Sequence, residues 1–577
     1  MKKVILLACC LLSSLLSAQL SKQDEQALDS VFTQWNQLEK PGMAGGLIYG
    51  TNVQYQKGFG IANLESKTRI TPTTQFHVDH LSQQFTILAV LLLENQGKLK
   101  LSDPVQKFVP ELPKYENLLT VGHLVNHCSG LDDYDMMKNI LGKNDEDVFT
   151  HNDALNMIYK QNTTRFDPGT KFSYILSKTE LTLLAEVVAK ASGESFSEYT
   201  KTNIFDVLGM QNSQFVEDHN QLVLGGAGSY QLDEEVYKKE VQNLGNAGPN
   251  NLWTCAADLM TWYKTLTLPS NHPLVDLIKK LDTSVKLDDG STYDSSWGRM
   301  TLGRSFFHTE RGLPAYWQYG LAGSYGSNVF RFPEQQLTSF VLGNNDAYNG
   351  MPAMMMAYHY VEDVFPETQE VTIKNKKKGK ISAKQLQTWA GSYWNKERGI
   401  ARRVFFERDT LFYGRIDQER GRPLIPLQEK NRFQLLVDSD DIIKFTFRNE
   451  NGVNYYDSTF GDSDPVHYQR FTPYEPDGNA LQEYSGNFYS PELNSVYQFK
   501  TENKQLVAKG PEGTKVTFFP VTKDVFRSDT FAWGSILFQR DTDGKLSGLH
   551  IMTDGIQGLE FFKFSYPKDE ANNAFVP

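Results

Sequence analysis

Apolar residues in the first two thirds of the chain follow helical spacing in some segments and strand spacing in others. This alternation predicts a large domain that mixes helices and strands. The predicted helices cover residues 82–93, 181–191, 258–266 and 351–364, and the predicted strands cover 45–55, 59–62 and 337–342, the first two as a hairpin.

Near residue 370 the pattern changes to short alternating strands. The segment 386–394 recurs at 481–489, a shift of 95 positions, and each copy is followed by strands and ends in an aromatic strand. We therefore predict two small antiparallel β-domains, as sheets or half-barrels, because two copies are too few for a solenoid. Their strands are expected at 403–406, 411–413 and 468–471, and at 496–499, 506–508 and 561–564.

The start of the chain has the pattern of a secretory signal. Lys2 and Lys3 precede an apolar run over residues 4–16, and the small residues Ser17 and Ala18 follow it. The run is too short to span a bilayer, and no later segment is apolar for about eighteen residues. We expect export to the periplasm or the extracellular space, with no transmembrane segment. A lipoprotein signal ending at a cysteine is disfavoured by the short apolar stretch ahead of it.

These patterns give a predicted division of the whole chain. A basic, apolar-poor stretch before the repeats reads as a solvated linker. The division is 1–18 signal peptide, 19–368 mixed domain, 369–384 basic linker, 385–475 β-module 1 and 476–577 β-module 2, the repeat of module 1.

Charge and cysteine content narrow the choice of partners and cofactors. The chain has 58 Lys plus Arg against 69 Asp plus Glu, with no basic domain, so nucleic acid is excluded as a partner. Cys128 and Cys255 remain after signal removal and are interpreted as two buried free thiols rather than a disulfide. There is no Cys-x-x-Cys and no zinc-type His spacing, so we expect no metal and no cofactor.

Several motifs between residues 41 and 364 resemble the serine β-lactamase and penicillin-binding protein superfamily, specifically its class C β-lactamase-related branch. They occur in the family's order over more than 300 residues. The resemblance implies an α/β (α+β) fold, a β-lactamase/transpeptidase-like domain followed here by the two small antiparallel β-domains. The motifs are Pro-Gly-Met-Ala-Gly at 41–45, His-Cys-Ser-Gly-Leu at 127–131, Pro-Gly-Thr-Lys-Phe-Ser-Tyr at 168–174, Ile-Phe-Asp-Val-Leu-Gly-Met at 204–210 and Leu-Trp-Thr-Cys-Ala-Ala-Asp at 252–258.

The resemblance also implies a chemistry. In the family, a serine at the start of a buried helix attacks an amide or ester carbonyl, and a lysine one turn later assists its deprotonation. A tyrosine serves as proton shuttle, with an asparagine two residues on. A strand bearing Lys-Thr-Gly or His-x-Gly walls the pocket and helps to form the oxyanion hole.

This sequence departs from the family at most of those places. The serine position is His80 and the lysine position is Gln83. The tyrosine is present as Tyr174, but the asparagine position is Leu176. The wall motif, which should carry a basic residue, reads Gln318, Tyr319 and Gly320.

Nearby residues offer little compensation. Ser82 lies two positions past His80, which rotates it about 200° around a helix and off the pocket face. The Ser-x-x-Lys motif at 565–568 lies after the last predicted strand and contains a proline, so it is interpreted as a chance match. His80 titrates near neutral pH and is a conceivable nucleophile or base, but Gln83 is neutral and cannot accept a proton.

The leading hypothesis is an exported, catalytically inactive homologue of the serine hydrolases. Its cleft, lined by His80, Gln83, Tyr174, Tyr319 and Gln318, would bind a peptide, a muropeptide-like molecule or a small amide without cleaving it. The alternative is an active esterase, D-aminopeptidase or D,D-peptidase with a substituted mechanism around His80 and Tyr174. The third is a scaffold whose β-modules bind a protein partner of unknown identity.

Overall fold

The structure is a computed structural model. It describes residues 20–50, 53–174, 177–268, 273–295, 297–366, 381–396, 398–416, 420–437, 442–460 and 465–565. The expected signal peptide, most of the basic linker and Leu176 lie outside the described residues.

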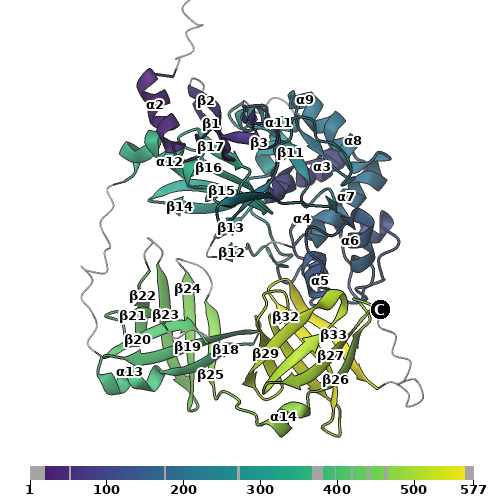
Figure 1. The fold of residues 1–577 in the computed structure, drawn as a ribbon, viewed down its shortest axis with the longest axis vertical. Coiled ribbons are helices and arrows are strands. Elements are labelled where there is room, and N and C mark those ends of the chain that lie inside the picture. The colour runs from purple at the N-terminus through teal and green to yellow at the C-terminus, as the bar shows by residue number, and fades with distance from the viewer. Residues whose placement is uncertain are drawn as a thin grey trace, which may run out of the picture.

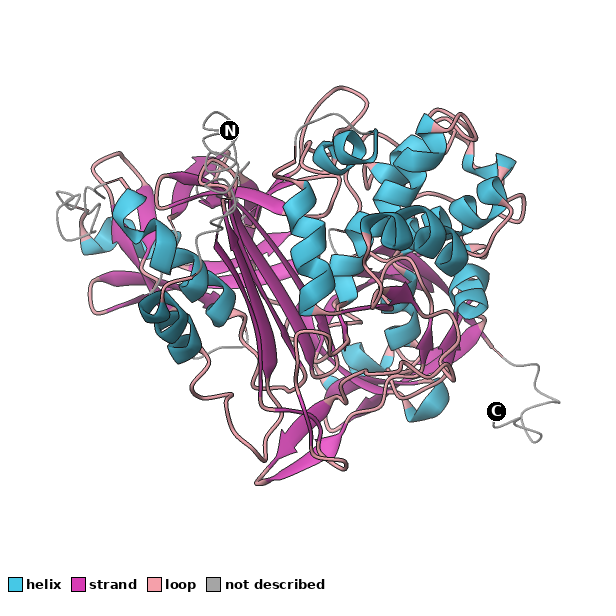
Figure 2. Ribbon diagram, turned by 90° about the horizontal axis from the view of Figure 1, so that it is seen from above, coloured by secondary structure: helices cyan, strands magenta, loops and turns pink. Residues whose placement is uncertain are grey.

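The N-terminal domain (described residues 20–366) is organised around an antiparallel sheet, which has eight strands over the described ranges. Helices cover both faces of this sheet, as Figure 2 shows. On one face, Leu28 of the first helix, Phe32 directly after it and Met356 of the last helix pack on Met43 and Leu47 of the sheet. In spatial order the strands are β12 (Asp294–Ser295), β13 (Gly298–Met300), β14 (Phe306–Glu310), β15 (Leu313–Ala322), β16 (Tyr325–Phe332), β17 (Leu337–Gly343), β1 (Met43–Tyr49) and β2 (Val53–Phe59).

The helical region on the other face surrounds one helix, α3 (Gln83–Asn95), which is buried on almost every side. A 3-10 turn, η1 (Asp79–Ser82), leads into it. The other helices are α2 (Lys22–Val31), α4 (Val121–Val125), α5 (Tyr134–Ile140), α6 (His151–Ile158), α7 (Thr179–Ser192), α8 (Phe196–Thr200), α9 (Asp206–Leu208), α10 (Ala256–Thr265), α11 (Pro273–Lys280) and α12 (Met351–Val361). Short strands are β3 (Ile61–Asn63), β4 (Thr68–Arg69), β5 (Phe76–His77), β6 (Phe149–Thr150), β7 (Gln214–Phe215), β8 (Tyr230–Asp233), β9 (Val236–Lys239), β10 (Leu244–Gly245) and β11 (Leu252–Thr254).

The C-terminal part forms two closed antiparallel barrels rather than open sheets or half-barrels (Figure 1). Closure pairs the first strand with the last, which removes the exposed edges that an open sheet would have. Barrel 1 follows α13 (Ala383–Trp389) and contains β18 (Gly391–Asn395), β19 (Ile400–Glu407), β20 (Thr410–Arg415), β21 (Arg422–Pro426), β22 (Arg432–Leu435), β23 (Ile443–Glu450), β24 (Val453–Phe460) and β25 (Val466–Phe471). Barrel 2 follows α14 (Gly478–Gln482) and contains β26 (Gly486–Ser490), β27 (Ser495–Glu502), β28 (Gln505–Lys509), β29 (Lys515–Thr522), β30 (Val525–Ser528), β31 (Ser535–Arg540), β32 (Leu546–Thr553) and β33 (Ile556–Phe564).

Most of the predicted elements are confirmed, but the N-terminal hairpin is displaced. Its turn begins at Gly50, whose φ of 58° is left-handed, so β1 ends at Tyr49 and β2 runs to Phe59. The prediction of strands at 45–55 and 59–62 was therefore wrong in register, because apolar alternation continues on both sides of the turn and does not locate it.

The two barrels relate differently to the N-terminal domain. One continuous hydrophobic cluster includes Met137 and Ile140 of α5 together with Tyr497 and Trp533 of barrel 2. Barrel 1 has a core of its own. In Figure 1 barrel 2 lies directly below α5, while barrel 1 lies beside it. Barrel 2 is thus packed into the helical region as part of one core.

Two smaller predictions concern the thiols and the membrane. Cys128 and Cys255 are both buried and free, which confirms the interpretation as unpaired thiols. Within the described ranges, no helix combines the length and the apolar character needed to cross a bilayer.

Candidate functional site

The site that the sequence predicts is built where η1 meets β15. A Cβ on Gly320 would lie 2.3 Å from the Val78 carbonyl oxygen and 2.9 Å from the His80 nitrogen, so only glycine permits this close approach. Gln83 follows His80 by three positions, which places the two side chains on one face of the helix start. We refer to His80, Gln83, Tyr174 and Tyr319 together as the His80 site.

His80 and Gln83 form a hydrogen-bonded pair. The Gln83 amide Nε2 donates to His80 Nδ1 at 2.9 Å, which leaves the imidazole proton on Nε2. That nitrogen faces Asp79 Oδ2 at 3.5 Å. Burial lowers the pKa of His80, and Lys178 lowers it further, against the opposing effect of the Asp79 carboxylate. The imidazole is therefore neutral at pH 7, and Gln83 occupies its free lone pair.

Asp79 is a residue whose role the sequence did not reveal. It is buried and has a left-handed φ of 42°, which is uncommon for a residue other than glycine. Its Oδ2 accepts a hydrogen bond from the Leu321 main-chain N–H at 3.2 Å. Leu321 follows the wall motif on β15, the strand that helps to form the oxyanion hole in the family that the sequence resembles. The Asp79 carboxylate thus already accepts the hydrogen bond that this main-chain N–H can donate.

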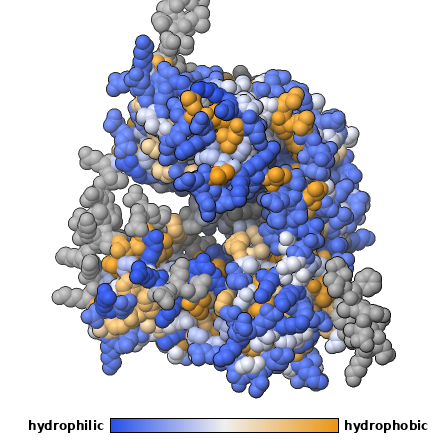
Figure 3. All heavy atoms as spheres, viewed as in Figure 1, coloured by the Kyte–Doolittle hydropathy of each residue, from blue (hydrophilic) through white to orange (hydrophobic). Residues whose placement is uncertain are grey.

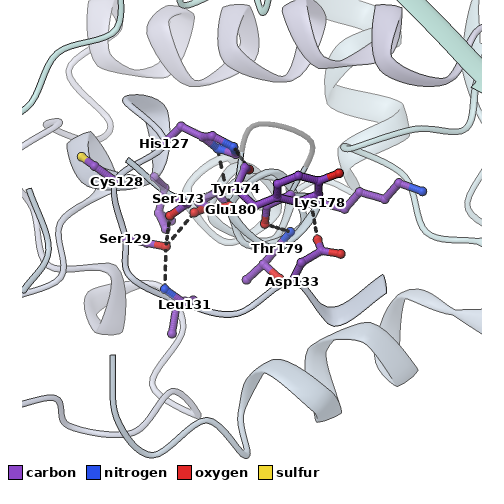
Figure 4. Close-up of polar contacts among 12 residues, drawn as sticks. His127, Cys128, Ser129, Leu131, Asp133, Ser173, Tyr174, Lys178, Thr179 and Glu180 are labelled. Carbon is purple, nitrogen blue, oxygen red and sulfur yellow. Dashed lines mark hydrogen bonds and ion pairs between the residues drawn. The ribbon is translucent and has the colours of Figure 1, made fainter. Parts of the chain in front are cut away.

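Tyr174 is positioned by a buried polar network beneath it, shown in Figure 4. His127 Nε2 lies 2.6 Å from the Tyr174 carbonyl oxygen, and His127 Nδ1 lies 3.5 Å from Glu180 Oε2. Ser129 donates to the other Glu180 oxygen at 2.7 Å. Burial alone would raise the pKa of Glu180, but His127, Ser173 and Ser129 hold it below its ordinary value. The network fixes the backbone that carries the tyrosine.

Lys178 is a second residue that the sequence analysis did not single out. It lies at the start of α7, and its Nζ donates to Asp135 Oδ2 at 3.1 Å. Burial would lower its pKa, but the Asp135 and Asp79 carboxylates hold the pKa well above its usual value. For Tyr174 burial itself raises the pKa, and Asp554 and Asp133 add to that effect. Both groups keep their protons at neutral pH and cannot act as bases there.

The other predicted residues are divided between the surface and the core. Tyr319 is partly exposed; its ring packs edge-on to His80 at 6.0 Å and stacks on Trp317 at 5.5 Å. Gln318 is only 3% exposed and donates to the main-chain oxygen of Gly303 at 3.2 Å, so it supports the wall from behind.

The serine considered as a replacement points elsewhere. Ser82 is fully buried, and its Oγ accepts a hydrogen bond from the Leu252 N–H at 3.3 Å. Among the described residues around His80, we find a neutral imidazole, an amide, an ammonium, a phenol and a carboxylate, but no nucleophile hydrogen-bonded to a free base. This arrangement can bind polar groups of a ligand and offers no evident route to acyl transfer.

Comparison with known proteins finds a family model and curated relatives that match this chain. The beta-lactamase family model matches residues 28–358. Penicillin-binding protein 4* of Bacillus subtilis (strain 168) is 25% identical over 385 residues, which cover 63% of this chain and 81% of that protein. The D-aminopeptidase of Gluconobacter oxydans (strain 621H) is 26% identical over 258 residues, or 45% of this chain and about half (48%) of that protein.

A solved structure shows the same fold over a larger share of the chain. The octameric penicillin-binding protein homologue from Pyrococcus abyssi aligns with a TM-score of 0.50 at 21% identity, covering 78% of this chain and 99% of that one. At this identity the likeness concerns the fold alone.

Proposed function

The chain belongs to the beta-lactamase family, and starting from that membership we propose that it is an exported homologue which has lost acyl-transfer chemistry and binds a peptide or cell-wall-like ligand at the His80 site. The predicted signal peptide supports the export, to the periplasm or beyond the cell. The names of its relatives, a penicillin-binding protein and a D-aminopeptidase, support a peptide-like ligand.

The observation that carries the proposal is that the polar groups around His80 are already engaged in hydrogen bonds within the protein. Gln83 occupies the Nδ1 lone pair, and Asp79 occupies the Leu321 N–H. For His80 to act as a nucleophile or as a base, its Nδ1 lone pair would have to be free. A tetrahedral intermediate would in addition place negative charge next to the Asp79 carboxylate. Losing the nucleophile and its partner together removes several orders of magnitude in rate in serine hydrolases.

Retained binding is supported by partly exposed aromatic rings beside His80. Tyr319 lies 5.4 Å from Trp297, which is 37% exposed, and these rings offer apolar area with polar edges. Such surfaces, with a few fixed polar groups, are typical of small-molecule and peptide sites.

The binding proposal predicts that purified cell-wall peptides bind and are recovered intact. By isothermal titration calorimetry, Tyr319→Ala should weaken binding by about tenfold or more, because it removes the ring next to His80. Tyr49→Ala, on β1 against Tyr360 and remote from the site, is the matched control and should bind as the wild type does. Absence of binding across the peptide panel would refute the ligand, and cleaved peptide in the mass spectrum would refute the loss of chemistry.

An active hydrolase with His80 as general base is the second candidate, and the Asp79–His80 contact is the observation in its favour. In such a dyad the carboxylate orients the imidazole while the other nitrogen takes the proton. Here that other nitrogen already accepts a hydrogen bond from Gln83, and the lowered pKa of His80 weakens it further as a base. We therefore favour the binding function.

A further inference from the structure

A cavity of about 640 Å³ opens where the N-terminal domain and the two barrels meet. Its walls include Tyr174 and Tyr293 of the N-terminal domain, Arg398 and Tyr468 of barrel 1, and Asp554 of barrel 2. The hollow between the three parts is visible in Figure 3. Its volume is in the range of small-molecule sites. Of the His80 site, Tyr174 lines this cavity whereas His80, Gln83 and Tyr319 do not, so the cavity adjoins the His80 site and extends away from it toward the barrels.

Some of the charged groups that line the cavity are already paired. Asp294 accepts a hydrogen bond from Arg299 Nε at 3.0 Å. His467 Nδ1 lies 2.6 Å from the Asp457 carboxylate. These pairs leave Arg398 and Asp554 as the lining charges without an ion pair among the described residues.

Arg398 is held on a hairpin that both barrels fix in place. Its main-chain N–H donates to Asn395 Oδ1 at 2.6 Å, and Ser535 of barrel 2 donates to the Gly399 carbonyl oxygen at 2.6 Å. The guanidinium itself is exposed to the cavity and makes no ion pair within the described ranges. The planar guanidinium of an anchored arginine at the wall of a cavity can donate hydrogen bonds to a ligand.

A second arginine, Arg402, adds positive charge near Asp554. Arg402 is half-buried and donates through Nε to the Tyr413 hydroxyl at 3.1 Å. Burial raises the pKa of Asp554, while Arg398 and Arg402 oppose this effect, which places both guanidinium groups within electrostatic reach of that carboxyl. Two positive charges thus lie within electrostatic reach of the one Asp554 carboxyl, and of the two arginines only Arg398 lines the cavity.

We propose that this cavity binds a small ligand through a carboxylate held by the Arg398 guanidinium, with the apolar part of the ligand against Tyr293 and Trp297. Carboxylates match the planar donor fork of arginine in bidentate geometry. A monoanion fits better than a phosphate dianion, because the Asp554 carboxylate repels a ligand with two negative charges more strongly than a ligand with one. The carboxylate could belong to a free organic acid or to the C-terminus of a short peptide.

The probes for this site are 4-fluorophenylacetate, its neutral amide and 4-fluorobenzoyl-glycyl-glycine, followed by ligand-observed ¹⁹F NMR on the full chain. The acid should bind about tenfold or more tightly than the amide, as expected for a charge-assisted contact. Tighter binding of the dipeptide than of phenylacetate assigns the carboxylate to a peptide end, and the reverse order assigns it to a free acid.

Variants locate the contact. Arg398→Gln should weaken binding of the acid by about tenfold or more, while Arg403→Gln, an exposed arginine on the same barrel that does not line the cavity, should not change it. Asp554→Asn should strengthen binding, because it removes the opposing carboxyl. Equal affinity for acid and amide, binding that survives Arg398→Gln, weaker binding in Asp554→Asn, or no binding of any probe would each overturn the proposal. Arg398 and Asp554 line the cavity and are not residues of the His80 site, so these variants distinguish a failure of this proposal from a failure of ligand binding at the His80 site.

Discussion

Replacing Glu180 with alanine is expected to lower the free energy of unfolding by roughly 3–5 kcal/mol, the usual cost of removing one partner from a buried charge pair. Glu180 is fully buried, and it accepts from Ser129 at 2.7 Å and faces His127 at 3.5 Å. Its loss leaves His127 and the Ser129 hydroxyl without that partner in a site that water does not reach. Urea denaturation followed by circular dichroism measures the change.

Glu180→Gln is the matched control for this network. The amide oxygen can still accept from Ser129, so its loss of stability should be clearly smaller than that of the alanine variant. A loss below about 1 kcal/mol for Glu180→Ala would show that the network does not hold the Tyr174 segment in place.

Replacing Arg165 with alanine is expected to lower the free energy of unfolding by a similar amount, roughly 3–5 kcal/mol. The substitution leaves two carboxylates without their cation at the junction of the helical region and barrel 2. Arg165 is 8% exposed and donates to Asp132 at 2.7 Å and to Glu492 at 2.8 Å. Asp132 also accepts from the Gln557 N–H of barrel 2 at 2.9 Å. The arginine therefore forms an ionic link between the helical region and barrel 2.

The pH dependence of this variant has a definite sign. Burial already raises the pKa of Glu492, and Arg165 opposes that rise. Without Arg165 the folded-state pKa moves further above the unfolded value, so the folded state favours the protonated carboxyl and loses stability as the pH rises through it. The deficit of Arg165→Ala relative to the wild type should be larger at pH 7 than at pH 5.

Arg540→Ala is the matched comparison for Arg165. Arg540 also bridges two carboxylates, Glu483 and Asp524, but on the outer side of barrel 2, and its loss should cost about 1 kcal/mol or less. Equal stability losses in the two variants, or an Arg165→Ala deficit that grows on acidification, would contradict the assignment of Arg165 as a buried link.

Local signals predicted much of the fold. The apolar run at 82–93 became α3, and the repeat at a shift of 95 became two barrels that each begin with a helix and a strand. These features depend on neighbours in the sequence, which a pattern records. Barrel closure and the shared core of barrel 2 depend on contacts such as Arg165 with Glu492, 327 positions apart, which a single sequence does not reveal.

The family resemblance was confirmed. The predictions drawn from it named His80 and Gln83, but not the residues that contact them. Asp79 lies beside His80 in the sequence, yet its hydrogen bond from Leu321 depends on the left-handed turn that brings η1 against β15. Lys178 reaches the same region from another helix. A signal for Asp79 was available: an acidic residue next to the nucleophile position conflicts with oxyanion stabilisation.

The most direct test of the central claim is intact-protein mass spectrometry after incubation with a fluorescent penicillin and, separately, with a fluorophosphonate. No adduct is expected on the wild-type chain. Labelling is expected of an Asp79→Gly, His80→Ser, Gln83→Lys variant, which carries a serine and a lysine at these two positions and frees the Leu321 N–H from its side-chain acceptor. An adduct on the wild type, mapped to His80 or Ser82, or a folded triple variant that stays unlabelled, would contradict it.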